Sequence, residues 1–194
     1  LPNGNGVTEY LAAKCGVKNN SEVMLIKNEK LSVIPITTHI DIDQITKKLN
    51  YKLIKEKIHT FNNWFKKNHN RNPKIAMLGL NPHNAELKKN SEEKKIIVPS
   101  LTKLKKNGIN VTGPLVADTV FIEDFKKFDV IVGMYHDQVL TPIKTIFEYD
   151  AINITLGLPF IRISPDHGPN EKMINKNLSN PLSLIKAIKF LDKK

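Results

Sequence analysis

The sequence predicts an α/β domain with a largely parallel or mixed sheet flanked by helices. Short apolar runs alternate with longer amphipathic stretches along the chain. The 194 residues contain 40% hydrophobic and 25% charged side chains, and no internal repeat or low-complexity tract interrupts the alternation. This length and composition fit folded globular structure and exclude a chain that is disordered throughout.

Five short apolar runs are expected to form the strands. Each run is bounded by Gly, Asn, Asp or Pro, as buried strands commonly are. The expected strands are residues 23–26, 32–36, 74–79, 130–134 and 151–155.

The helices are predicted from apolar spacing and from residues that begin and end helices. Residues 51–69 carry bulky apolar side chains three, four and seven positions apart, which predicts one face packed on the core. Ser91 and Gly108 bound a second helix over residues 91–106, which Pro99 is expected to interrupt. Further helices are expected after Asp41 or Asp43 and from about residue 181 to 191.

The sequence shows no membrane-spanning stretch, no signal-peptide pattern and no pair of cysteines. No stretch approaches the roughly 18 consecutive apolar residues of a spanning helix, and the first residues lack the basic and then apolar order of a signal peptide. We therefore expect a soluble, cytoplasmic protein without a membrane partner. Cys15 is the only cysteine, which excludes an internal disulfide and a cysteine-type zinc site.

The net charge of +11 raises the alternative of a basic nucleic-acid-binding module. Arg71 and Arg162 are the only arginines, however, and the lysines are scattered in pairs over several amphipathic stretches. Arginine is the side chain that most often reads guanine and clamps phosphate. The charge pattern therefore favours a solvated surface over a nucleic-acid surface.

Three histidines follow predicted strands. His39, His83 and His136 come after the runs that begin at residues 32, 74 and 130. In open α/β sheets, ligand-binding groups collect outside the carboxyl ends of the strands, so these imidazoles could converge. Three imidazoles suit a divalent metal such as zinc. The wide gaps match no short ligand signature, so a structural role for each histidine stays open.

Two polar residues lie within apolar runs near the carboxyl end of the chain. Asn153 stands inside a predicted strand, where its amide needs a hydrogen-bond partner from the fold or from a ligand. Arg162 follows an apolar segment and is suited to a carboxylate or phosphate, with an internal salt bridge as the alternative.

Several motifs, in order along nearly the whole chain, resemble the 4-hydroxythreonine-4-phosphate dehydrogenase family of pyridoxal phosphate biosynthesis. The motifs are TTH (37–39), GLNPH (79–83) with Glu86, GPLVADT (113–119), MYHDQ (134–138), NITLGLPFIR (153–162) and DHG (166–168). The resemblance implies a fold like that of isocitrate and isopropylmalate dehydrogenases. It also implies an NAD- or NADP-linked, metal-requiring oxidation and decarboxylation of 4-phosphohydroxy-L-threonine to 3-amino-2-oxopropyl phosphate.

The resemblance also implies roles for individual residues. His39, His83 and His136 match three ligands of a divalent zinc, magnesium or cobalt ion, in a site that the family shares across a homodimer interface. The substrate-binding positions are matched by Thr8, Lys144, Asn153 and Arg162, and acidic positions beside the site by Asp118 and Asp137. The two aspartates are expected to orient other groups or to handle protons. No cofactor-binding residue is assigned.

The chain departs from the family pattern at several points. Val7 stands where the family has a histidine, which favours the alternative of a related dehydrogenase acting on another phosphorylated or carboxylated hydroxy acid. Ala85 and Val139 replace glycines, and Ala85 would be strained if that position needs a positive φ.

Family members are longer than this chain. We therefore expect a fragment in which residues 1–164 form the metal-binding and dimerisation lobe. Residues 165–194 would return toward an N-terminal lobe that the sequence does not contain. Little or no dehydrogenase activity is expected of the isolated chain, because the cofactor cleft of the family lies between the two lobes.

Overall fold

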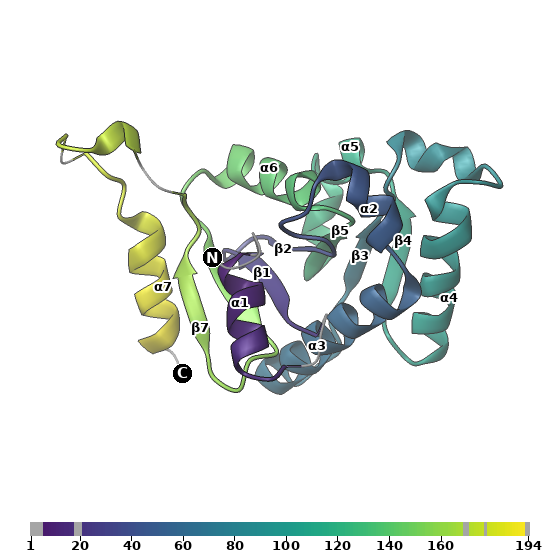
Figure 1. Ribbon diagram of the computed structural model, residues 1–194, viewed down its shortest axis with the longest axis horizontal. Coiled ribbons are helices and arrows are strands. Elements are labelled where there is room, and N and C mark those ends of the chain that lie inside the picture. Colours follow the sequence, from purple (N-terminus) through teal and green to yellow (C-terminus); the bar gives the residue numbers. More distant parts are fainter. Residues whose placement is uncertain (1–5, 18–20, 169–170, 177, 193–194) are drawn as a thin grey trace.

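A computed structural model describes residues 6–17, 21–168, 171–176 and 178–192, and it confirms the α/β prediction (Figure 1). The strands are β1 (Val23–Lys27), β2 (Ser32–Pro35), β3 (Ile75–Leu78), β4 (Val111–Leu115), β5 (Val130–Gly133), β6 (Ile152–Leu156) and β7 (Arg162–Pro165). The α-helices are α1 (Val7–Lys14), α2 (Ile42–Lys48), α3 (Tyr51–His69), α4 (Val98–Lys106), α5 (Ala117–Val120), α6 (His136–Phe147) and α7 (Leu182–Asp192). Short 3-10 segments span Asp124–Lys127 and Glu171–Met173, a π-helical turn spans Glu93–Ile97, and Pro82–Leu87 forms a turn in which His83 to Glu86 have non-helical φ and ψ angles.

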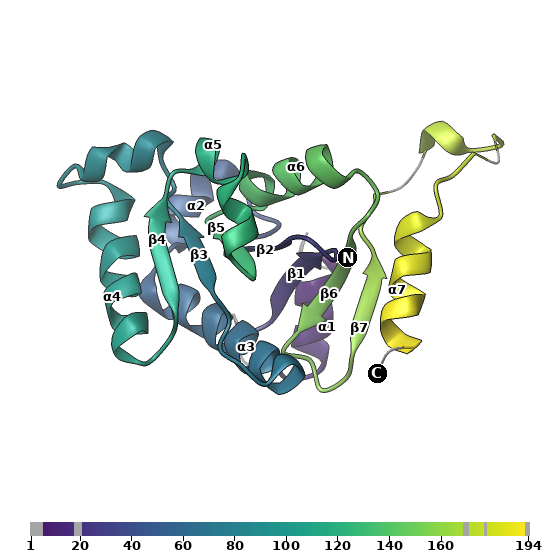
Figure 2. The ribbon, with the colours of Figure 1, turned by 180° about the vertical axis from the view of Figure 1, so that it is seen from behind.

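The seven strands form one mixed sheet with the order β4-β3-β5-β2-β1-β6-β7. The pairs β4–β3, β3–β5 and β5–β2 are parallel. The pairs β2–β1, β1–β6 and β6–β7 are antiparallel. The sheet therefore has a parallel half and an antiparallel half, and Figure 2 shows α4 beside the first and α7 beside the second.

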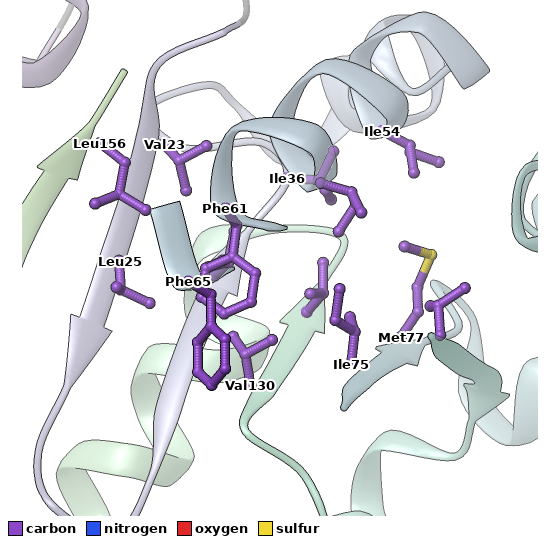
Figure 3. Packing of buried hydrophobic residues seen from close by; sticks show 14 of the residues in the cluster. Val23, Leu25, Ile36, Ile54, Phe61, Phe65, Ile75, Met77, Val130 and Leu156 are labelled. Atoms are coloured by element: carbon purple, nitrogen blue, oxygen red, sulfur yellow. The ribbon is translucent and has the colours of Figure 1, made fainter. Parts of the chain in front are cut away.

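Helices cover both faces of the sheet because successive strand residues point to opposite sides. In β1, Val23 and Leu25 pack into a cluster with α3, α4 and α7, whereas Met24 and Ile26 pack into a cluster with α5 and α6. Figure 3 shows side chains of α3 projecting toward the first face. Such strands, buried on both faces, read in the sequence as continuous apolar runs, which is why they could be recognised.

Helix α3 has the bounds that its apolar spacing predicts. Asn50 caps it, since its side-chain oxygen accepts a hydrogen bond from the Leu53 amide at 3.0 Å. The helix ends at Asn70, which adopts a left-handed conformation with φ 52°.

No helix in the described ranges is long and apolar enough to cross a membrane.

The five predicted strands are confirmed, but β4 and β7 were missed. β4 contains Gly113 and Pro114, and β7 is a half-buried edge strand that includes Ser164 and Pro165. Neither has a continuous apolar run, and both combine residues that are depleted in strands.

The irregularity predicted at Pro99 is present, but it does not break the helical backbone. Residues 93–97 form a π-helical turn, regular α-helix begins only with α4 at Val98, and Pro99 lies in the first turn of α4. Ser91 does stand at the beginning of this helical region, because its hydroxyl accepts a hydrogen bond from the Lys94 amide at 3.2 Å.

Helix α7 presents small residues to the sheet and large apolar residues to solvent. Ser183 and Ala187 are buried, and the Ser183 hydroxyl donates to the Ala151 carbonyl. The exposed apolar side chains, each at least 41% accessible, are Leu184, Ile185, Ile188 and Leu191. This outward face is unusually apolar for a surface helix.

Candidate metal and substrate site

The carboxyl ends of the four parallel strands carry four of the candidate residues. In sheet order, Asp118 follows β4, His83 follows β3, His136 follows β5 and His39 follows β2. Because parallel strands end at one edge of a sheet, residues far apart in the sequence lie along the same rim. The candidate histidines therefore lie at the carboxyl ends of parallel strands, as their positions in the sequence predict.

His39 and His136 are brought together by backbone pairing beyond β2 and β5. The Ile36 amide donates to the Gly133 carbonyl at 2.8 Å, and the Thr37 amide donates to the Met134 carbonyl at 3.1 Å. These bonds hold the two chain segments side by side up to the histidines. The two imidazole ring centres are 5.8 Å apart, with 45° between the ring planes.

This separation suits two imidazoles that share one metal ion. With metal–nitrogen bonds of about 2.0 to 2.1 Å, two imidazoles on a tetrahedral ion have ring centres roughly 5 to 6 Å apart. Within the described residues, no group of three His, Cys, Asp or Glu side chains is close enough to hold a metal. His83 therefore does not join His39 and His136 in a single-chain cluster.

Both paired histidines have a carboxylate beside Nδ1. His39 Nδ1 lies 3.2 Å from Glu9 Oε2, and His136 Nδ1 lies 2.7 Å from Asp137 Oδ1. Thr38 also donates its hydroxyl to Glu9. Burial raises the pKa of Glu9, but the hydrogen bonds from His39 and Thr38 outweigh it and lower that pKa to about 2. The hydrogen bond to Glu9 raises the pKa of His39.

Glu9 could not be recognised from the sequence as a neighbour of His39. It directly follows Thr8, so the only signal was an acidic residue next to a position matched by resemblance. Its partner His39 lies on a different element, and no local pattern links them.

His83 lies in a loop with a left-handed backbone. Its residues His83 to Leu87 all have φ between 46° and 56°. Hydrogen bonds tie the chain before the loop to the chain after it. Buried Glu93, which follows the loop, accepts hydrogen bonds from the Leu80 and Asn81 amides, which precede it, at 2.8 and 2.7 Å. His83 itself is exposed.

Ala85→Gly is expected to raise the free energy of unfolding by about 0.5 to 1 kcal/mol, because Ala85 has φ 46° and a left-handed conformation costs a residue with a Cβ. Urea denaturation measures the change. Ala13→Gly, on an exposed face of α1, is the matched control and should lower stability instead. Equal destabilisation by both substitutions would show that Ala85 is not strained.

A second group of candidate residues meets around β6. Thr8 Oγ1 lies 3.5 Å from Thr155 Oγ1, and Arg162 Nη1 donates to Thr155 Oγ1 at 3.0 Å. Asn153, two positions before Thr155 on the same face of β6, has a buried Oδ1 with no hydrogen-bond partner among the described residues. Thr155 was not predicted, although it joins three candidates into one group.

Arg162 is half-buried, and within the described structure its guanidinium contacts a neutral hydroxyl rather than a carboxylate. Burial lowers the pKa of this guanidinium. The internal salt bridge considered from the sequence is therefore not found in the described part of the chain. A cation held without a neutralising partner favours an anionic ligand.

Lys144 of α6 is already paired. Its ammonium donates to the Asp166 carbonyl at 2.8 Å and lies 3.2 Å from Asp166 Oδ2. Both residues line a cavity of about 510 Å³ that also includes Glu148, Tyr149 and His167. No described contact joins Lys144 to the Arg162 group, so a ligand that uses both must reach between them.

Asp118, the remaining candidate, is exposed in α5. It lies at the outer edge of the parallel half, beyond β3. The structure therefore gives it access to solvent at the rim that carries the histidines.

The chain is similar to known proteins over nearly all of its length. A model of the family described as pyridoxal phosphate biosynthetic protein PdxA matches residues 3–191. The 4-hydroxythreonine-4-phosphate dehydrogenase of Sulfurihydrogenibium sp. is 43% identical over 187 residues, which cover 95% of this chain and 57% of that protein. The enzyme of the same name from Bradyrhizobium diazoefficiens is 41% identical over 191 residues, which cover 95% and 55%.

The solved structures agree with the sequence comparison. The crystal structure of 4-hydroxythreonine-4-phosphate dehydrogenase from Klebsiella pneumoniae superposes with a TM-score of 0.81 at 36% identity. The superposition covers 95% of this chain and 56% of the crystallised one. The chain thus spans a little over half the length of the relatives that it matches.

Proposed function

Because the chain belongs to the PdxA family of pyridoxal phosphate biosynthetic proteins, as its motifs predict, we propose that it provides the metal-binding and substrate-binding part of a 4-hydroxythreonine-4-phosphate dehydrogenase. The proposed reaction is the NAD- or NADP-linked oxidation of 4-phosphohydroxy-L-threonine. Loss of carbon dioxide from the resulting keto acid then gives 3-amino-2-oxopropyl phosphate. Such a protein would work in the cytoplasm.

We propose that His39 and His136 hold a divalent zinc, magnesium or cobalt ion, with His83 of a second copy as the third ligand. The 5.8 Å separation of the two rings supports the pair, and an all-imidazole site favours zinc or cobalt over magnesium. A bound ion would polarise the substrate oxygen at the oxidised carbon. The exposed position of His83, outside any three-residue cluster in the described chain, supports a site completed by a homodimer.

The observation that carries the proposal is the half-buried Arg162 without a described carboxylate partner. Its planar guanidinium suits the phosphate or carboxylate of the substrate. Asn153 Oδ1, buried and unpaired among the described residues, could accept a hydrogen bond from the substrate ammonium. Thr8 adds a hydroxyl through Thr155, and Lys144 would exchange part of its contact with Asp166 for the substrate.

The acidic candidates would handle protons or orient other groups. Asp137 accepts a hydrogen bond from His136 Nδ1 and would fix that ring. Asp118 is exposed at the same rim and would exchange protons between the site and solvent.

For the domain organisation, we propose that residues 1–164 form the metal-binding and dimerisation lobe and that residues 165–194 contact another lobe. The apolar outward face of α7 supports this division.

Calorimetry of substrate binding tests the proposed function. In the presence of zinc, 4-phosphohydroxy-L-threonine is expected to bind at least about 10-fold more tightly than unphosphorylated 4-hydroxy-L-threonine, because a charge-assisted hydrogen-bond partner is lost with the phosphate. NADH formation on the same sample measures turnover. We expect the 194-residue chain to show little or no turnover. Equal affinity for the two compounds would contradict the substrate assignment.

The alternative substrate, another phosphorylated or carboxylated hydroxy acid, is favoured by Val7. This residue is 46% exposed beside Thr8, where the family has a histidine. Binding measurements with a panel of such acids distinguish the two, since a tighter ligand than 4-phosphohydroxy-L-threonine would favour the alternative.

A further inference from the structure

We propose that Glu9 is a positioning residue, which keeps the proton of His39 on Nδ1 so that Nε2 is the nitrogen free to bind a metal. The inference rests on the proposed function for the role of His39 as a ligand. It adds a residue from a separate element, α1, to the support of the site.

The Glu9 carboxylate is fixed from two sides. Thr38 donates its hydroxyl to Oε1, and His39 Nδ1 lies 3.4 Å from Oε1 and 3.2 Å from Oε2. Side-chain exposure is 22% for Glu9 and 38% for His39, so the contact is only partly solvated. The hydrogen bond from Thr38 therefore helps to hold the Glu9 carboxylate where it can accept a hydrogen bond from His39 Nδ1.

Gly6 makes room for this contact. A Cβ atom at Gly6 would lie 2.2 Å from His39 Nδ1 and 2.7 Å from Glu9 Oε2. Any side chain at this position would collide with both partners, so the backbone before α1 is closely fitted around them.

The chemistry of the pair sets the tautomer of His39. An ionised carboxylate only accepts hydrogen bonds, so the facing nitrogen Nδ1 must carry the proton. In a neutral imidazole the other nitrogen, Nε2, then has the free lone pair. A carboxylate that fixes the ring and raises its basicity is the usual outer partner of a metal-binding histidine.

His136 has the same arrangement from a different source. Asp137 is its neighbour in the sequence and lies 2.7 Å from Nδ1, whereas Glu9 is 30 residues from His39. Both rings therefore leave Nε2 free, at a ring separation suited to one shared ion. Glu9 also follows Thr8, which contacts Thr155. The first turn of α1 thus touches both the histidine pair and the Arg162 group.

The tautomer of His39 is tested first, without metal. Long-range ¹H–¹⁵N NMR at about pH 9, where imidazoles are neutral, reports which nitrogen carries the proton. We expect the Nδ1-protonated form in the unmodified chain and a shift to the Nε2-protonated form in Glu9→Ala. Glu9→Gln keeps an accepting oxygen and should retain the Nδ1 proton. Glu29→Ala, which removes an exposed carboxylate between β1 and β2, is the matched control and should change nothing.

Zinc affinity, measured by competition with a chromophoric chelator, is the second readout. Glu9→Ala should weaken zinc binding by roughly 10- to 100-fold, and Glu9→Gln by less, relative to Glu29→Ala. If Glu9→Ala does not fold, Glu9→Gln carries the test, with a loss of zinc affinity expected at an unchanged melting temperature.

An unchanged tautomer in Glu9→Ala, or a zinc affinity equal to that of Glu29→Ala, would overturn the proposal. Failure of the proposed function looks different. If the unmodified chain binds no zinc, His39 is not a ligand, whereas the NMR result still decides whether Glu9 sets its tautomer.

Discussion

Replacing His136 with alanine is expected to lower zinc affinity by at least about 100-fold, more than the loss of an outer partner causes. The reason is that His136 is one of only two imidazoles that the described chain brings together, at 5.8 Å. Removing it leaves His39 as the one imidazole that the described chain would give to the site, and with the proposed His83 of a second copy two ligands remain where three are needed to hold the ion firmly. Elemental analysis after gel filtration, together with chelator competition, measures the change.

His59→Ala is the control for the His136 variant. His59 lies within α3 and does not follow a strand of the sheet, so its loss should leave metal content unaltered. If His136→Ala retained the full metal content of the unmodified chain, His136 would be excluded as a ligand.

Arg162→Lys is expected to weaken binding of 4-phosphohydroxy-L-threonine by roughly 10- to 100-fold, the range of a lost hydrogen bond to a charged group. The substitution keeps the charge but removes the planar fork that binds phosphate or carboxylate through two hydrogen bonds. Lysine also cannot maintain the same contact to Thr155, which lies 3.0 Å from Nη1. Isothermal titration calorimetry measures the affinity.

The chain offers one matched control for this substitution. Arg71, the only other arginine, donates to Asp129 at 2.7 Å on the surface. Arg71→Lys changes the same chemical group at unchanged net charge and should leave substrate affinity intact. An Arg162→Lys variant with the affinity of Arg71→Lys would mean that Arg162 has a structural role alone.

The sequence predicted the buried strands and α3 because burial on two faces, or on one helical face, leaves a periodic apolar pattern. It did not predict β4 and β7, since an edge strand such as Arg162–Pro165 is half-buried and needs no such pattern. Strand order could not be predicted either. The neighbours of β5 in the sheet are β3 and β2, which lie in two separate parts of the chain.

The part of the candidate site that lies at strand ends could be predicted, because the strands themselves could be predicted. His39 and His136 were identified from their positions after apolar runs, and parallel pairing of β2 with β5 brings them together. Glu9 and Thr155 were missed because their roles depend on contacts between α1, the loop after β2 and β6, which no local spacing encodes. The sequence also could not show that His83 lies apart from the other two histidines within the described chain, since the left-handed loop decides where His83 lies.

The pairing of β2 with β5 would make folding depend on metal supply if His39 and His136 hold the proposed ion. His39 and His136 become neighbours only when these strands are paired, so an ion held by both would bind the folded chain and not the unfolded one. By mass action, a free ion at 100 times its dissociation constant adds about 2.7 kcal/mol to stability. That is a large part of the roughly 5 to 15 kcal/mol typical of a whole domain. The ion would then crosslink His39 and His136, which are far apart in the sequence. The folded fraction of the protein would therefore rise with the cellular concentration of the ion.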